Sequence, residues 1–233
     1  MGAFHAYDIR GVYNLDFDKD TAYKVGYFLP ELLSAEKVLV GRDARVSSPE
    51  IHEYLLKGIT DAGADVYDIG LSTTPMVYFG TANYGFKASV QITASHNPAE
   101  YNGIKIFSGD GYKIPDALEE QIETLVLDEE IPENLSGTDI GKVTYANNAV
   151  RDYVEHLKST VMNSLDGLNI AVDCANGSAS VSAEMLFKEL GANADILHNK
   201  PNGININRNC GSTHIELLRE YVLSNKLDAG VAY

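Results

Sequence analysis

Short runs of apolar, β-branched residues alternate along this chain with longer amphipathic stretches. Residues 37–40, 65–69 and 87–93 have the composition of buried strands, whereas residues 18–34 and 116–129 repeat apolar side chains at helical spacing. This alternation predicts an α/β fold, in which helices are layered on sheets, and argues against an all-helical or an all-β domain.

A polar segment broken by proline and glycine, residues 132–141, interrupts this pattern. Such composition is typical of a domain boundary. We therefore expect two consecutive α/β domains, residues 1–142 and 143–233, each a mixed sheet layered with helices. The sequence stops inside an apolar run at residues 229–233. Because domains usually finish on an element that is tied down, we expect the second domain to be truncated at its C-terminal end.

The amino-acid composition argues against several classes of binding partner. The chain has 233 residues, with 33 acidic and 18 basic side chains and a formal net charge of −15. Such a surface repels nucleic-acid phosphates and anionic membranes, so we expect neither as a partner. Cys174 and Cys210 lack CxxC spacing, which argues against a disulfide framework or a zinc site. With no recognisable signal peptide or membrane span, we expect a cytoplasmic protein.

The segment Thr-Ala-Ser-His-Asn-Pro, residues 93–98, directly follows a predicted strand. Functional groups of α/β proteins gather in loops at the C-terminal ends of strands, which makes Ser95 a candidate nucleophile. A dyad with His96 is awkward, because neighbouring side chains of an extended chain point to opposite sides. His96 is better placed to contact a bound anion. Taken alone, the segment is also typical of a structural turn that ends at Asn97-Pro98.

Several cations lie near this segment or near the N-terminus. Lys105 follows it by ten residues, Arg10 lies in the N-terminal segment, and Arg42 and Arg45 flank Asp43 after a predicted strand. Each can bind a phosphate, since arginine offers a bidentate fork and lysine a point charge. The alternative for each is a surface ion pair, and the group around Asp43 looks most like a structural network.

Four segments taken together resemble the α-D-phosphohexomutase family. They are Tyr-Asp-Ile-Arg-Gly at 7–11, Gly-Arg-Asp-Ala-Arg at 41–45, Thr-Ala-Ser-His-Asn-Pro at 93–98 and Asn-Gly-Ile-Lys at 102–105, in the family's order and spacing. The match continues through residues 172–177 and so covers essentially the whole chain. The resemblance implies that Ser95 carries a phosphoryl group and donates it to a hexose phosphate through a hexose bisphosphate intermediate.

The resemblance also assigns roles to individual residues. It implies that Arg10, His96 and Lys105 line the site as cations and acid/base groups, and that Tyr7 and Asn97 support phosphate and substrate binding. Phosphoryl transfer depends mainly on positioning and positive charge, which fits this set. The implied cofactors are Mg²⁺, bound in part through the phosphate on Ser95, and a hexose bisphosphate as activator. The family's aspartate ligands would lie beyond residue 233, so we expect the isolated chain to be inactive as a mutase, that is, unable to complete the catalytic cycle.

The sequence indicates the sugar of the substrate less clearly than it indicates the family. Residues 7–11 resemble the phosphomannomutase/phosphoglucomutase branch, whereas residues 107–113 and 202–214 resemble the phosphoglucosamine mutase branch. The first segment is nearest the active serine in the family, so we expect interconversion of the 1-phosphates and 6-phosphates of glucose or mannose. The alternatives are a phosphoglucosamine mutase, a non-catalytic fragment that binds sugar phosphate, and a serine hydrolase.

Overall fold

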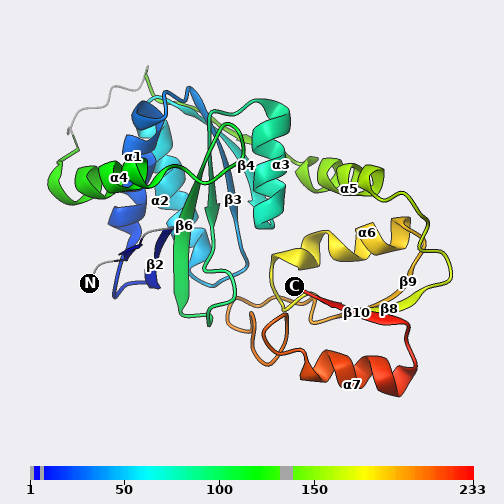
Figure 1. Ribbon diagram of the computed structural model, residues 1–233. Coiled ribbons are helices and arrows are strands. Elements are labelled where there is room, and N and C mark those ends of the chain that lie inside the picture. Colours follow the sequence, from blue (N-terminus) through cyan, green and yellow to red (C-terminus); the bar gives the residue numbers. More distant parts are fainter. Residues whose placement is uncertain (1–2, 6–7, 132–138) are drawn as a thin grey trace. The chain divides into compact units, whose positions relative to one another are not determined.

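The chain divides into two compact units (Figure 1). The computed structural model describes residues 3–5, 8–131 and 139–233. The first unit comprises Met1–Asp43, Ser47–Ala94 and Glu100–Asn147, and the second comprises Ala44–Val46, Ser95–Ala99 and Asn148–Tyr233. Both are α/β, as the sequence predicts. Each unit is described by itself.

A mixed sheet forms the centre of the first unit, with the order β1-β2-β6-β5-β3-β4-β7 among the described residues. Strands β3, β4, β5 and β7 are parallel where they pair, whereas β6 is antiparallel to β5 and to β2, and β2 is antiparallel to β1. The strands are β1 (Phe4–His5), β2 (Asp8–Val12), β3 (Lys37–Arg42), β4 (Asp65–Leu71), β5 (Ala88–Ile92), β6 (Tyr101–Ser108) and β7 (Val143–Tyr145).

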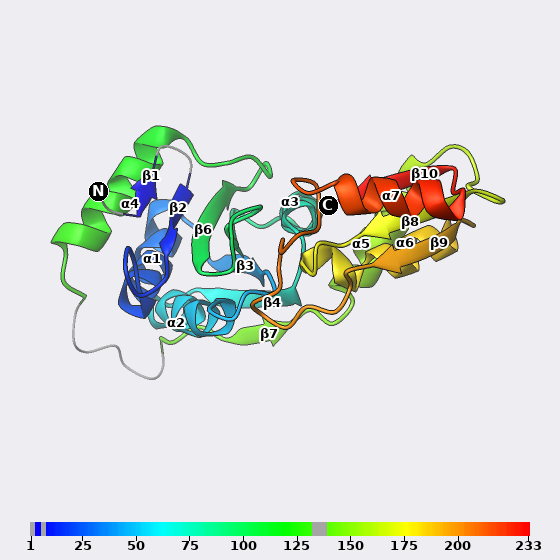
Figure 2. The ribbon, with the colours of Figure 1, turned by 90° about the horizontal axis from the view of Figure 1, so that it is seen from below.

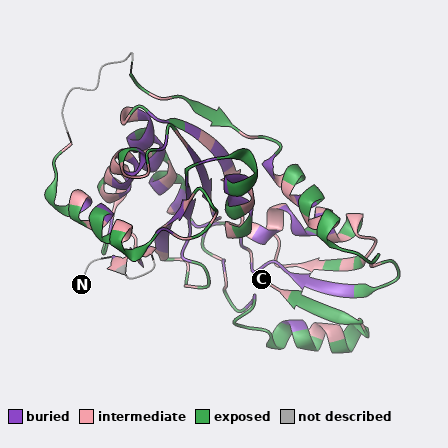
Figure 3. Ribbon diagram, turned by 45° about the horizontal axis from the view of Figure 1, so that its top comes forward, coloured by how far each residue is buried: buried purple, intermediate pink, exposed green. Residues whose placement is uncertain are grey.

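Helices cover both faces of this sheet. Figure 2 shows α3 (Thr74–Tyr84) on the side away from α1 (Lys19–Leu32) and α2 (Ser48–Asp61), and α4 (Asp116–Asp128) packs on α1. The α1–α2 contact requires glycine, because a Cβ at Gly58 would lie 2.1 Å from the carbonyl oxygen of Tyr23. The inward faces are apolar and buried, which forms the core of this unit (Figure 3).

The second unit is built on a smaller sheet with the order β10-β8-β9. All three described strands, β8 (Asn169–Asp173), β9 (Asn193–Leu197) and β10 (Ala229–Ala232), run parallel, whereas a mixed sheet was expected. Helix α6 (Ala183–Glu189) packs on β9, α7 (Glu216–Asn225) packs on β8 and β10, and α5 (Ala149–Thr160) packs on α6. A 3-10 turn at Ser178–Val181 precedes α6.

The pairing register aligns the C-terminal ends of these three strands. Asp173 of β8 stands opposite Leu197 of β9 and Ala232 of β10. The residues that follow each strand therefore emerge at one edge of the sheet, where α/β proteins usually place functional groups. Among the described residues, no helix is both long enough and apolar enough to cross a bilayer.

Candidate active site

Ser95 lies in the loop that follows β5, the most completely buried strand of the first sheet. The residue is exposed, and its backbone is left-handed, with a φ of 55°. That conformation costs a residue other than glycine about 1–2 kcal/mol, so other contacts must hold it. An exposed residue at a strand end, on a loop held in an unfavourable conformation, is the kind of position at which functional groups of α/β proteins gather.

Two side chains hold the carbonyl oxygens of this loop. Arg45 Nη2 donates to the carbonyl oxygens of Ser95 and Asn97, both at 2.9 Å, and its Nη1 donates to that of Pro98. Asn207 Nδ2 donates to the same two oxygens, at 3.0 Å to Ser95 and 3.2 Å to Asn97. We call Arg45 and Asn207 the loop clamp. It belongs entirely to the second unit.

Arg45 is part of a structural network, which is the interpretation that the sequence favours for the group around Asp43. Its residue surface is only 1% exposed, and its guanidinium binds the backbone of the serine loop. Sequence analysis assigned no role to Asn207. Its only signal is its place in residues 202–214, the segment that resembles the phosphoglucosamine mutase branch.

The loop clamp is completed by a backbone contact. The amide of Val46 donates to the carbonyl oxygen of Gly203 at 2.9 Å, so the segment that carries Arg45 pairs with the segment that leads to Asn207. Gly203 has a φ of 90°, and a Cβ there would lie 3.1 Å from Val46 Cα. Glycine is therefore required for both the conformation and the approach.

A second group of predicted site residues lies in the first unit. Arg10 on β2 and Lys105 on β6 both bind Asp8, with Arg10 Nη2 at 2.5 Å and Lys105 Nζ at 2.9 Å from Asp8 Oδ2. The strands are neighbours, and Arg10 stands opposite Gly103 in the antiparallel register. The side chains of Arg10 and Lys105 remain 23% and 24% exposed, so both cations can still reach solvent.

Asp8 therefore holds the two cations together by pairing with both, a role that sequence analysis did not assign to it. Burial alone would raise the pKa of Asp8, but the hydrogen bonds and charges of Lys105 and Arg10 outweigh it and hold the pKa below its ordinary value. One carboxylate shared by two cations leaves one net positive charge. Such a group can attract an anion without being fully neutralised.

A buried polar network supports the strand ends of the first unit. Asn102 Nδ2 donates to the hydroxyls of Ser47 and Ser48 at 2.8 and 2.9 Å, and the Ser48 hydroxyl donates to Asp43 Oδ1 at 2.6 Å. The amide of Asp43 in turn donates to the carbonyl oxygen of Ile92 at 2.8 Å. These hydrogen bonds connect the ends of β3 and β5 to the start of β6. Asn102 and Ser48, which take part in them, are fully buried.

The remaining predicted residues are placed as follows. His96 is exposed and Asn97 is half-buried, both in the serine loop of the second unit. Tyr7 lies outside the described residues. The structure therefore places Ser95, His96 and Asn97 in one unit and Arg10 and Lys105 in the other.

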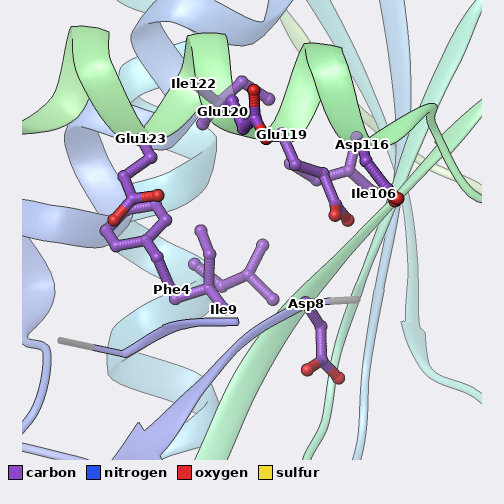
Figure 4. Close-up of a pocket in the computed structure, with 10 residues that line it drawn as sticks. Phe4, Asp8, Ile9, Ile106, Asp116, Glu119, Glu120, Ile122 and Glu123 are labelled. Carbon is purple, nitrogen blue, oxygen red and sulfur yellow. The ribbon is translucent and has the colours of Figure 1, made fainter. Parts of the chain in front are cut away.

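A cavity of about 310 Å³ lies between β2, β6 and α4 (Figure 4), and Asp8 is one of its lining residues. Its lining includes the apolar side chains of Ile9 and Ile106 and the acidic residues Asp8, Glu119 and Glu123, and the Asp8 carboxylate points away from those of α4. Burial raises the pKa of Glu119, although Lys113 lies 2.9 Å from one of its oxygens. So many carboxylates disfavour a phosphate, and we do not assign substrate binding to this cavity.

Comparisons with known proteins support the family resemblance that the sequence segments indicate. A family model described as "Phosphoglucomutase/phosphomannomutase, alpha/beta/alpha domain I" matches residues 1–132. The phosphoglucosamine mutase of Clostridium botulinum is 43% identical, in an alignment that covers 100% of this chain and 54% of that protein. A phosphoglucomutase/phosphomannomutase family structure from Burkholderia thailandensis superposes with a TM-score of 0.85 at 28% identity, over 99% of this chain and 52% of the other.

A more distant relative shares the fold alone. The Aspergillus fumigatus N-acetylphosphoglucosamine mutase, solved in complex with GlcNAc-6P and magnesium, has a TM-score of 0.52 at 15% identity, over 93% of this chain and 44% of that chain. The chain spans about half the length of the curated relatives it matches. Since the family model covers more than half of its residues and includes the serine loop, the chain belongs to the α-D-phosphohexomutase family.

Proposed function

We propose that this chain is the phosphoryl-carrying part of a phosphoglucosamine mutase, with Ser95 as the carrier. The observation that carries the proposal is the loop clamp, which holds an exposed serine in a left-handed conformation at the end of a buried strand. A carrier oxygen must be accessible and fixed, because phosphoryl transfer depends on in-line positioning more than on covalent chemistry by the protein.

The preference for glucosamine phosphates replaces the expected preference for glucose or mannose phosphates. Phosphoglucosamine mutases are 43% identical over the whole chain, and the segments at 107–113 and 202–214 favour the same branch. The N-terminal segment, on which the first expectation depended, covers only five residues. It includes Tyr7, which lies outside the described residues.

The proposed reaction proceeds in two transfers. The bond between phosphorus and the Ser95 oxygen breaks as a bond forms to the free hydroxyl oxygen of the sugar monophosphate, and the hydroxyl proton ends on the serine oxygen. The resulting bisphosphate then returns its other phosphoryl group to Ser95. Atoms and charge balance over the cycle, and the product is the isomeric monophosphate.

Arg10, Lys105 and His96 are proposed as the charged groups of this reaction. For Arg10 and Lys105 the proposal is supported by the family resemblance, by their partial exposure and by their shared pairing with Asp8. Cations at a transferring phosphoryl group stabilise the charge on its oxygens. His96 is proposed as an acid/base group on the family resemblance and on its exposure.

Magnesium is proposed as a cofactor of the whole protein, because a family member has been solved with it. Within the described residues, only one group of three or more potential His, Cys, Asp or Glu ligands converges, namely Asp173, His198 and Cys210. A thiol does not suit Mg²⁺, which prefers oxygen ligands. The described residues therefore do not form a complete magnesium site, and the two transfers above are written without the ion.

Mass spectrometry tests the carrier role. The chain is incubated with glucosamine 1,6-bisphosphate and Mg²⁺, and we expect a mass gain of about 80 Da that maps to Ser95. Ser95→Ala should not gain this mass, whereas Ser224→Ala, which changes an exposed serine of α7, should gain it normally. Glucose 1,6-bisphosphate should react more slowly. Absence of phosphate on Ser95 with both donors, or labelling of Ser95 by a fluorophosphonate, would overturn the proposal.

A further inference from the structure

We infer a site for a zinc-class divalent ion at the C-terminal edge of the second sheet, formed by Asp173, His198 and Cys210. The ligand atoms of these three residues all lie within 4.8 Å of one another. Asp173 ends β8, His198 follows β9 directly, and Cys210 lies in the loop before α7. The inference concerns the second unit alone and does not depend on the proposed mutase function.

The carboxylate of Asp173 is held in a fixed orientation. It is 1% exposed, and its Oδ1 accepts a hydrogen bond from the amide of Ala175 at 2.8 Å. Its Oδ2 accepts one from the amide of Gly211 at 2.9 Å. Because Gly211 follows Cys210, the same contact also fixes the segment that carries the thiol. Such outer contacts are what orient the ligands of protein metal sites.

The imidazole of His198 presents a nitrogen that the described residues leave unsatisfied. Its Nδ1 atom is buried, has no hydrogen-bond partner in the described part of the chain, and lies 3.0 Å from Asp173 Oδ1. A buried polar atom without a partner is costly. Ligand atoms of a tetrahedral zinc ion lie about 3.3–3.6 Å apart, so the nitrogen and the oxygen are already close to the spacing that one shared ion would require.

Cys210 completes a donor set that favours zinc over magnesium. Its residue surface is fully buried, and its Sγ accepts a weak contact from Asn176 Nδ2 at 3.9 Å. A thiolate, a carboxylate and a neutral imidazole are a borderline-soft set, which suits Zn²⁺. The thiol must lose its proton on binding. The two negative charges of thiolate and carboxylate then balance the charge of the ion.

An entry route is available through His198, whose side chain is 35% exposed although its Nδ1 atom is buried. The spacing of the cysteines in the sequence argued against a zinc site, since no CxxC pair is present. The fold overrides that argument: the parallel register brings the ends of β8 and β9 to one sheet edge, and the Gly211 amide bond to Asp173 holds the Cys210 segment beside them. The competing explanation is a purely structural contact between His198 and Asp173.

Cobalt substitution separates the two explanations. The chain is stripped with EDTA and titrated with Co²⁺ in excess Mg²⁺, which occupies sites that accept only oxygen ligands. We expect one ion per chain, a thiolate-to-cobalt charge-transfer band, and displacement of cobalt by Zn²⁺. Cys210→Ser should lose the band, and His198→Gln should weaken Zn²⁺ binding by more than about tenfold. Cys174→Ser and His214→Gln are the matched controls and should bind as the parent chain does.

Circular dichroism checks that each variant folds, and if Cys210→Ser fails to fold, His198→Gln carries the test because that side chain is partly exposed. Zn²⁺ should also raise the melting temperature of the parent chain and of the control variants, and that of His198→Gln by clearly less at the same Zn²⁺ concentration. A cobalt spectrum without the thiolate band, a band that survives in Cys210→Ser, or equal Zn²⁺ affinity for the parent chain and His198→Gln would overturn the inference.

Discussion

Replacement of Arg45 by methionine removes the charged half of the loop clamp and keeps the length of the side chain. Arg45 makes three hydrogen bonds to loop carbonyl oxygens, and a bond from a charged donor contributes about 1.5–3 kcal/mol. The oxygens of Ser95 and Asn97 keep Asn207 as a donor, whereas that of Pro98 loses its bond from Arg45 Nη1. We therefore expect a loss of about 3 kcal/mol in unfolding free energy, which is less than the sum of three bonds.

The assay has two readouts. Urea unfolding gives the change in free energy, and mass spectrometry gives the rate of Ser95 phosphorylation by glucosamine 1,6-bisphosphate. The left-handed conformation at Ser95 costs about 1–2 kcal/mol, so the loop should leave it once the clamp is weakened, and the rate should fall by more than the population of unfolded chain explains. Arg45→Lys should be intermediate, because one ammonium cannot span three carbonyl oxygens.

Asn207→Ala is the second variant, since it removes two bonds from a neutral amide at a half-buried position. We expect a loss of about 1–2 kcal/mol and a chain that still folds, with slower phosphorylation of Ser95. Ser224→Ala controls for substitution in the second unit. Unchanged stability in Arg45→Met, or a parental phosphorylation rate in both clamp variants, would refute the reasoning.

Three further predictions follow from the first unit. Folding lowers the pKa of Asp8, so the ionised Asp8 stabilises the folded chain above the unfolded pKa of about 3.9, and this stabilisation is lost as the pH falls through the folded pKa. The urea midpoint of the parent chain should therefore fall between pH 6 and about 3. The midpoint of Asp8→Asn should fall less steeply over the same range. Gly103→Ala places a Cβ 2.4 Å from the carbonyl oxygen of Ile9 and should cost about 2 kcal/mol or more in urea unfolding. Gly58→Ala should lower the melting temperature despite the better helix propensity of alanine, since its Cβ meets the Tyr23 carbonyl oxygen at 2.1 Å; a raised melting temperature would contradict this.

Local patterns in the sequence predicted the strand before Ser95 and the loop after it. The strand was predicted at residues 87–93 and is observed at Ala88–Ile92. Such a prediction succeeds because an apolar, β-branched run bounded by a turn signal indicates a strand from local sequence alone. The partners of the loop were not predictable in the same way. Asn207 lies 112 residues from Ser95, and Arg45 lies 50 residues from it.

The sequence by itself determined the α/β class, the position of Ser95 at a strand end and the list of candidate cations, because these depend on local periodicity and residue type. Tertiary structure alone decided how those groups are used: Arg45 binds the serine loop, and Asp8 pairs Lys105 with Arg10. Strand pairing and register place distant residues side by side, and their hydrogen bonds form only where the folded backbone delivers both partners within about 3 Å. No local sequence pattern encodes these tertiary contacts.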